Sequence, residues 1–313
     1  MVSKLKFNKK RLEKLIQKSF PNAKIKNYKQ FFTGLISPTF NVEIEHPKKR
    51  IVIKLAKLKN KEKIHQNNKI LNYLYENNIP APKVFFEEIF DKKYITIMDY
   101  IKGDVASKIY EGANLKLRKK ILINTGKNLR KIHNLKIPSF WIHQHHEVKN
   151  PKEWKDWTKL RIDKYLNFFK KKLKGDYKFL NNELNEFWMV LKNSKIEFVP
   201  LHWDYHLSNL NVDYKGGVTG VFDFDNSMKG HNLADIGQTA YWIRFKINDY
   251  ENFGSFLKGY KKQFNKDELK LIKGYFLLHL LAVSRTIWFR KKRLGWIIKE
   301  HKKILDEFRK GKF

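Results

Sequence analysis

The residues that most constrain this chain lie between positions 201 and 225, where two apolar runs flank a turn rich in oxygen-bearing side chains. The first run enters the turn that carries Asp204, Asn209 follows five positions later, and the second run delivers Asp223. Carboxylate and amide oxygens suit Mg²⁺, so Asn209 and Asp223 could share that ion while Asp204 takes a proton from an attacking hydroxyl. Alone, Asp204, Ser208 or Asn209 is a common turn former between strands. Their order and apolar flanks favour a site for metal and phosphate.

The net charge is the strongest feature of the composition. The 313 residues include 66 Lys and Arg against 31 acids, a formal charge of +35, and the 42% hydrophobic and 15% aromatic fractions indicate a packed globular protein. Such a charge attracts phosphates of any kind. Because the excess is nearly all Lys and is spread along the chain, it allows nucleic acid as a partner but does not favour it, since groove-reading proteins concentrate Arg in a stripe or arm.

Cysteine is absent, which excludes a disulfide framework, a thiolate metal site and a cysteine nucleophile. The first seven residues lack the apolar segment of a secretory signal. The longest apolar run, from Tyr275 to Val283, is interrupted by His279 and is too short to span a bilayer. We therefore expect a cytoplasmic protein with no membrane partner.

Hydrophobic periodicity divides the chain into two parts. The first predicts helices and strands in mixed order, and the break at 99–103 then serves as a linker. The second is mainly helical, with a hairpin turned by two glycines and helix breaks at Gly254, Gly274 and near Gly295. These patterns predict a two-lobed α+β protein with parts 1–99 and 100–313. The expected helices are 8–19, 60–77, 115–135, 154–172, 183–193 and the region from 232 onward; the expected strands are 25–32, 42–45, 50–55, 84–90, 94–98, 210–212 and 218–222.

The first part contains a candidate phosphate-binding region. The loop 33–41, with Gly34 and Ser37, joins two expected strands, and Lys54 lies on the strand after them. Backbone N–H groups of such a loop and the lysine ammonium can donate to nucleotide phosphates. Taken alone, the loop also fits an ordinary β-turn and Lys54 a solvated lysine.

Histidines supply two further candidates. His133, near the end of its helix, fits a structural or helix-dipole partner better than a catalyst. The cluster His143, His145 and His146 could bind a metal, but no carboxylate stands at a helical spacing to complete the site.

The segment His202–Asn209, followed by Val221–Asp225, resembles the catalytic and metal-binding loops of the aminoglycoside phosphotransferase and choline kinase superfamily. The resemblance continues in order through the Gly34 loop, Lys54, 79–82, 97–103 and 129–133, and so covers about 25–245. It implies a protein-kinase-like fold with a small antiparallel-sheet N-lobe that binds nucleotide and a larger, mainly helical C-lobe that carries catalysis and the acceptor.

The resemblance also implies a role for each matching residue. Asp204 would be the catalytic base, and His202 would hold the catalytic loop in shape. Asp235 would support the same turn by hydrogen bonding. The expected metal ligands are Asn209, Asp223 and Asp225; the expected nucleotide contacts are Lys54, Gly34, Ser37 and the backbone of 98–100, which includes Met98 and Tyr100.

Two positions depart from the family pattern. The family usually pairs the strand lysine with a glutamate on the second helix, whereas the matching position here is Asn67 and the nearby acid is Glu62. The phosphate loop is also poor in glycine and contains Pro38.

The combined prediction is an ATP- and Mg²⁺-dependent kinase that phosphorylates a hydroxyl of a small molecule. Because acids are scarce and bases abundant after residue 240, a neutral or anionic metabolite such as a sugar, an amino alcohol or homoserine fits better than a cationic aminoglycoside. The alternative is a kinase-like module that binds RNA or the ribosome through its basic surface without catalysis. A protein kinase is unsupported, because no activation segment of the usual length follows Asp223.

Overall fold

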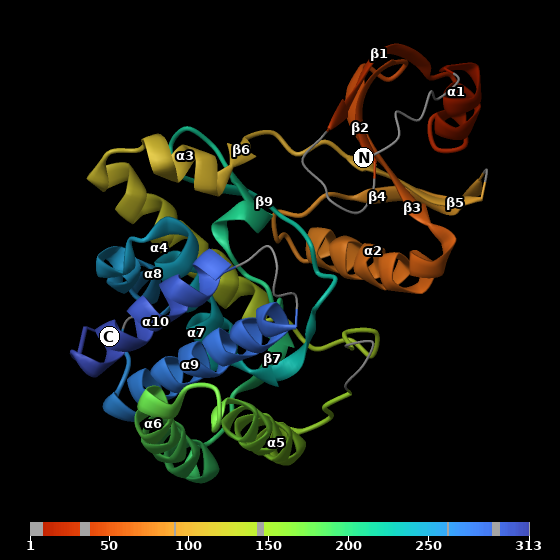
Figure 1. Cartoon of the computed structure of the whole chain (residues 1–313). Helices are drawn as coiled ribbons and strands as arrows, with labels where there is room; N and C mark the ends of the chain where they lie inside the picture. The colour runs from red at the N-terminus through yellow and green to blue at the C-terminus, as the bar shows by residue number, and fades with distance from the viewer. Residues whose placement is uncertain are drawn as a thin grey trace. The chain divides into compact units, whose positions relative to one another are not determined.

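The computed structural model describes residues 9–31, 38–90, 92–142, 147–261, 263–289 and 295–312. It divides into two compact units (Figure 1). Unit 1 comprises Met1–Asp104, Asn211–Asp213 and Val218–Asp225, and unit 2 comprises Val105–Leu210, Tyr214–Gly217 and Asn226–Phe313. The 210–222 hairpin therefore contributes most of its strands to unit 1, although it follows the break at 99–103 in the chain.

Unit 1 is built on an antiparallel sheet of order β1-β2-β3-β5-β4. A short turn joins β2 to β3, whereas helix α2 lies between β3 and β4 in the chain, so that β5 rather than β4 pairs with β3. The strands are β1 (Lys24–Phe31), β2 (Thr39–Glu45), β3 (Lys49–Lys57), β4 (Val84–Phe90) and β5 (Lys93–Asp99).

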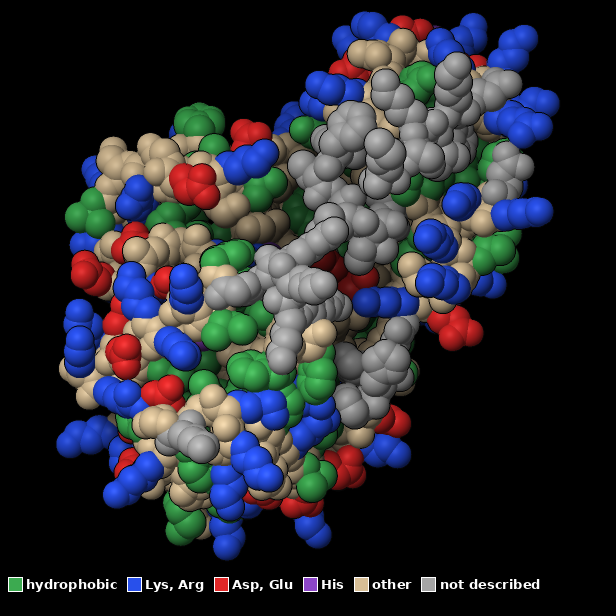
Figure 2. Space-filling view, viewed as in Figure 1, with side chains coloured by type: hydrophobic (Ala, Val, Ile, Leu, Met, Phe, Trp, Pro, Cys, Tyr) green, Lys and Arg blue, Asp and Glu red, His purple; other side chains and the backbone are tan. Residues whose placement is uncertain are grey.

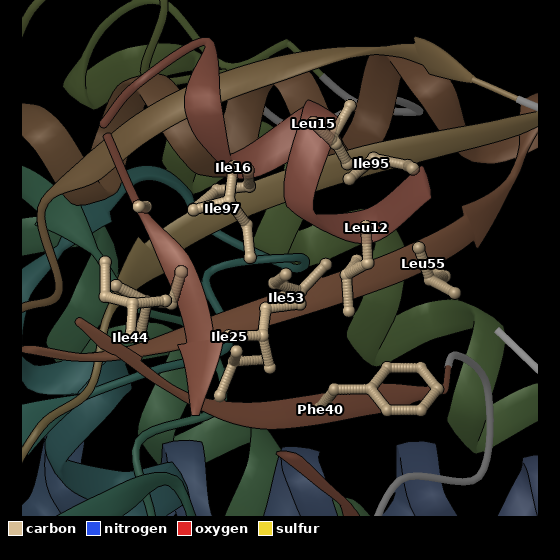
Figure 3. Packing of buried hydrophobic residues seen from close by; sticks show 13 residues of the cluster. Leu12, Leu15, Ile16, Ile25, Phe40, Ile44, Ile53, Leu55, Ile95 and Ile97 are labelled. Atoms are coloured by element: carbon tan, nitrogen blue, oxygen red, sulfur yellow. The ribbon is translucent and has the colours of Figure 1, made fainter. Parts of the chain in front are cut away.

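One face of this sheet is covered by helix α1 (Lys9–Gln17). Leu12, Leu15 and Ile16 of α1 are buried against strand residues such as Ile53 and Ile97 (Figure 3). Alternate residues of β3 and β5 point into this cluster, because side chains alternate between the two faces of a strand. The amphipathic N-terminal helix predicted from the sequence thus closes a hydrophobic core.

The opposite face of the sheet packs against helix α2 (Lys61–Glu76). Ile64 of α2 forms a buried cluster with Ala56 of β3 and Tyr94 of β5. Lys54 is two residues before Ala56 and lies opposite Thr96 in the strand register. The alternation of side chains therefore places Lys54 on the α2 face of the sheet.

Unit 2 is mainly helical (Figure 1). A two-stranded antiparallel sheet pairs β7 (Phe198–Leu201) with β10 (Met228–His231). Three short strands, β6 (Asp104–Val105), β8 (Leu210–Val212) and β9 (Val218–Val221), form a further sheet of order β6-β8-β9, and most of its residues belong to unit 1. The helices are α3 (Ala106–Gly112), α4 (Leu115–His133), α5 (Pro151–Phe169), α6 (Lys174–Asn193), α7 (Asn232–Trp242), α8 (Phe253–Tyr260), α9 (Lys266–Trp288) and α10 (Gly295–Arg309).

Three sequence predictions about helices are wrong. Helix α6 begins at Lys174, nine residues before the predicted start at 183. Gly274 does not break a helix but lies inside α9, where a Cβ atom would come within 2.1 Å of the Phe187 ring. The glycine thus permits close packing rather than a turn. Gly254 similarly lies in the first turn of α8.

The small antiparallel sheet of unit 1 and the helices of unit 2 confirm the α+β class. Within the described ranges, no helix is both long enough and apolar enough to cross a membrane.

Candidate active site

The Asp204 loop in unit 2 is anchored by a buried carboxylate. Asp235, near the start of α7, accepts hydrogen bonds from the backbone N–H of His202 at 2.8 Å and of Trp203 at 2.9 Å. Trp203 has a φ of 61°, a strained conformation for a bulky residue. Its ring packs edge-on against Trp154. Two backbone hydrogen bonds and aromatic packing thus hold the backbone immediately before Asp204.

A second layer of hydrogen bonds supports Asp235. His133 Nε2 lies 3.1 Å from Asp235 Oδ2, and His133 Nδ1 lies 2.8 Å from the Tyr260 hydroxyl. All three side chains are buried. The geometry confirms the predictions that Asp235 supports the turn and that His133 is structural.

The loop itself is also internally hydrogen-bonded. His202 is fully buried, and its Nδ1 accepts from the backbone N–H of Asp204 at 3.2 Å. Asn209 donates its amide to the Asp204 carbonyl at 3.0 Å, which leaves the Asn209 amide oxygen as the end suited to a metal. The Asp204 side chain is 23% exposed, so this carboxylate is accessible to a substrate.

Two basic residues lie beside Asp204. His206 Nε2 is 3.6 Å from Asp204 Oδ1, and Lys246 Nζ is 3.2 Å from the same His206 nitrogen. Burial lowers the pKa of His206 to about 3, with the charge of Lys246 acting in the same direction, so His206 is neutral at pH 7. Neither residue was predicted from the sequence. His206 lies two residues after Asp204, and this spacing could have indicated that the two side chains are close. Lys246 is 40 residues beyond His206, so no sequence spacing indicated its contact.

Unit 1 carries the predicted metal loop, Asp223-Phe224-Asp225, after β9. Asp223 is exposed and has a φ of 65°, while Phe224 is buried. Alternation of exposed and buried residues anchors the loop through its phenylalanine and presents the Asp223 carboxylate to solvent.

Two side chains of helix α2 contact this loop. The side-chain oxygen of Asn67 accepts the backbone N–H of Phe224 at 3.0 Å, and Lys63 Nζ lies 3.4 Å from Asp225 Oδ2. Asn67 is 6% exposed. The residue at the position of the family's glutamate thus binds the metal loop. The other acid considered, Glu62, is exposed in the first turn of α2.

The predicted nucleotide contacts of unit 1 lie on neighbouring strands. Lys54 makes no ion pair with any residue that the structure describes, so its ammonium is available to phosphates. Met98 is 8% exposed on β5. The Tyr100 ring stacks under the Arg50 guanidinium at 3.8 Å, and the Tyr100 N–H donates to the Arg50 carbonyl at 3.4 Å.

Several predicted residues lie outside the described part of the chain. These are Gly34 and Ser37 of the phosphate loop, and His143, His145 and His146. Among the described residues, no three His, Asp or Glu side chains gather in a metal-binding group.

The donor set fits Mg²⁺ in its chemistry. Asp225 Oδ1 is buried and has no hydrogen-bond partner in the described structure. A bound cation would supply the partner that this oxygen lacks. Asp223, in the same unit, adds a hard oxygen donor of the kind that Mg²⁺ requires.

Solved structures share this fold at low sequence identity. A protein of Ralstonia eutropha JMP134, assigned provisionally to the aminoglycoside phosphotransferases, matches with a TM-score of 0.66 and 15% identity over 95% of this chain and 94% of its own. The aminoglycoside phosphotransferase APH(4)-Ia, in a thermostable mutant bound to ADP and hygromycin B, matches with a TM-score of 0.64 and 13% identity over 94% and 98%. Macrolide 2'-phosphotransferase MphH of Brachybacterium faecium matches with a TM-score of 0.63 and 12% identity over 95% and 97%.

These likenesses establish the kinase-like fold expected from the sequence. No curated protein matches the chain. The model of the phosphotransferase enzyme family named APH matches residues 28–271, which include the Asp204 loop, the Asp223 loop and Lys54. With the family motifs held in place by Asp235 in one unit and by Asn67 in the other, the chain belongs to the APH phosphotransferase enzyme family.

Proposed function

We propose that this phosphotransferase moves the γ-phosphoryl group of ATP to a hydroxyl of a small molecule, with Asp204 as the base. The observation that carries the proposal is the Asp204 loop, in which the carboxylate is accessible while Asp235 holds the backbone on its N-terminal side. Such a fixed acceptor for a proton is what in-line phosphoryl transfer needs.

In this mechanism Asp204 orients the acceptor hydroxyl and takes its proton as the hydroxyl oxygen attacks the γ-phosphorus. The bond from that phosphorus to its bridging oxygen breaks, and ADP leaves with the electron pair. Lys54 donates to the α- and β-phosphates, and the 98–100 backbone meets the adenine. Asn209, Asp223 and Asp225 would hold Mg²⁺, which supplies positive charge to the β- and γ-phosphates. His202 positions the loop and, being buried, touches no substrate.

Gly34 and Ser37 would cover the phosphates in this scheme. The acceptor is a neutral or anionic metabolite such as a sugar, an amino alcohol or homoserine. The alternative of an RNA- or ribosome-binding module has less support, because Lys and Arg side chains are dispersed over the face shown in Figure 2.

The test is a metabolite panel assayed for ATP consumption with Mg²⁺. Asp204→Ala should lower turnover by roughly 10²–10⁴-fold, the usual contribution of general base catalysis. Asp223→Ala should abolish the metal-dependent reaction. Both carboxylates are accessible, so both variants should stay folded, which a cooperative thermal unfolding transition checks.

Wild-type turnover in either variant would overturn the assignment of its residue. RNA binding that weakens steeply with salt, without any nucleotide consumption, would favour the alternative module.

A further inference from the structure

Lys246 lies on an unusual element. It belongs to η3 (Ile243–Ile247), a π-helical turn that directly continues α7 and ends at Asn248, which has a φ of 54°. Single π-helical turns are rare and recur at functional sites. This turn brings the Lys246 ammonium to 3.2 Å from His206 Nε2 and to 4.4 Å from the centroid of the Trp242 ring. The turn thus carries a cation to the loop that contains Asp204.

The ammonium is accessible but poorly solvated. Lys246 is exposed, yet desolvation by the surrounding protein lowers its pKa, with Asp204 acting in the opposite direction. It forms no ion pair with a described carboxylate. Arg244, two residues earlier, is buried and bound by Glu300 and Glu307. The fold therefore neutralises one cation of this segment and leaves the other beside the base.

The hydrogen-bond pattern around His206 adds a second observation. The backbone N–H of Ser208 donates to His206 Nδ1 at 3.2 Å, so the neutral ring carries its proton on Nε2. The Lys246 ammonium lies 3.2 Å from that same nitrogen. Two donors thus face one another, with the Asp204 carboxylate 3.6 Å from Nε2 as the nearby acceptor. An anionic oxygen lying beside the pair could accept from both donors at once.

A further positive charge lies near the loop. The Arg161 guanidinium is 5.4 Å from the ring of Trp203, the residue before Asp204, and 4.5 Å from the Trp157 ring. Arg161 is engaged by aromatic rings and by no described carboxylate. Its charge and that of Lys246 disfavour a cationic ligand and favour an anionic one.

We propose that Lys246 and the Nε2–H of His206 form a subsite for an anionic group, a carboxylate or a phosphate, on the molecule whose hydroxyl is phosphorylated. This inference rests on the proposed function, because Asp204 defines where the acceptor hydroxyl is placed. It narrows the acceptor from neutral or anionic metabolites to hydroxylated acids and phosphate esters.

Binding tests the subsite independently of catalysis. The probes are D-glycerate, glycerol 3-phosphate, inorganic phosphate and glycerol, titrated without nucleotide and followed by tryptophan fluorescence, with Trp242→Phe to identify the reporter. We expect saturable binding of the three anions, weakened at least ten-fold in Lys246→Met and retained in Lys246→Arg. Lys270→Met, which removes an exposed charge on α9, is the matched control and should bind as the wild type does.

Equal anion affinity in wild type and Lys246→Met, or glycerol binding as tight as that of the anions, would overturn the subsite. Binding of glycerate alone would identify a carboxylate group, and binding of the two phosphates alone a phosphate group. Both results support the proposal.

Turnover with ATP and Mg²⁺ separates the subsite from the proposed function. Lys246→Met should act mainly on KM, raising it by a larger factor for anionic acceptors than for glycerol. An equal loss of kcat for every acceptor, water included, would mean that Lys246 serves the transferred phosphoryl group instead, and would overturn the subsite. Anion binding without turnover of any acceptor in the wild type would count against the proposed function while supporting the subsite.

Discussion

At the scale of single residues, Asn67 makes a different contact from the glutamate that the family usually has at this position. The resemblance implies an acid there that pairs with Lys54, yet the Asn67 side chain accepts the backbone N–H of Phe224. Phe224 directly follows Asp223, whose φ of 65° is uncommon for a residue other than glycine. One buried acceptor thus stabilises the backbone that presents the predicted metal ligand.

Replacing Asn67 should therefore alter metal dependence. Asn67→Leu leaves the buried Phe224 N–H without an acceptor, at a cost of about 1–3 kcal/mol. Because that cost acts on the Asp223 loop, we expect the Mg²⁺ concentration for half-maximal activity to rise about ten-fold. The measurement is a Mg²⁺ titration of ATP consumption.

Asn67→Asp keeps an acceptor oxygen at the same distance from the backbone and serves as the rescue control. An unchanged Mg²⁺ midpoint in Asn67→Leu would show that the hydrogen bond does not position the metal loop.

At the scale of elements, glycines set how closely the helices of unit 2 approach. A Cβ at Gly259 of α8 would come within 2.0 Å of the Ile123 carbonyl oxygen in α4, and one at Gly126 of α4 within 2.2 Å of the Phe256 carbonyl oxygen in α8. A Cβ at Gly274 of α9 would likewise come within 2.1 Å of the Phe187 ring in α6. Helices α4 and α9 carry His133 and Tyr275, whose hydrogen bonds reach the residues around the Asp204 loop, so close packing supports the site.

Gly274→Ala should destabilise the protein although alanine is the better helix former. The intrinsic preference favours alanine by about 1 kcal/mol, whereas overpacking against the Phe187 ring costs about 1–3 kcal/mol. We expect a lower midpoint in urea denaturation.

Gly175→Ala in α6 is the matched control, because a Cβ there meets nothing within 4 Å. It should leave the midpoint unchanged or raise it. A stabilised Gly274→Ala would show that α6 and α9 can separate without cost.

At the scale of the whole molecule, unit 2 buries histidines in their neutral form. Burial lowers the pKa of His206 and His231 to about 3 and that of His301 to about 4. Each of these side chains is less than one-tenth exposed. The unfolded chain takes up protons near pH 6.5, whereas the folded chain resists protonation until far lower pH.

Stability should therefore fall on acidification. Between pH 6.5 and about 4 the unfolded state binds more protons than the native state, so the free energy of unfolding rises with pH in that window and is level above it. Each histidine contributes at most about 1.4 kcal/mol per pH unit. The measurement is the urea midpoint at a series of pH values from 7.5 to 5.

His301→Gln, which removes one titrating group, should flatten that dependence. A midpoint that stays constant down to pH 5 would show that the histidines are protonated in the folded state.

The order of elements in unit 1 could be predicted because it depends on local patterns. Alternation at 50–55 and helical spacing at 60–77 identified β3 and α2 to within a few residues. The role of glycine could not be predicted, because the sequence around Gly274 looks like that of a helix break. Whether a glycine ends a helix or accommodates a neighbour depends on what packs against it, and here that neighbour is Phe187, from a helix distant in sequence.

The sequence by itself determined the family motifs, the two-part α+β organisation and the roles proposed for Asp204 and Asp223. These follow from residue order and short-range periodicity. The tertiary structure alone decided that Asn67 binds the Phe224 backbone 157 residues away and that Lys246 meets His206 across 40 residues. Such contacts depend on how separate elements pack, and neither propensity nor spacing carries that information, because each describes only neighbours along the chain.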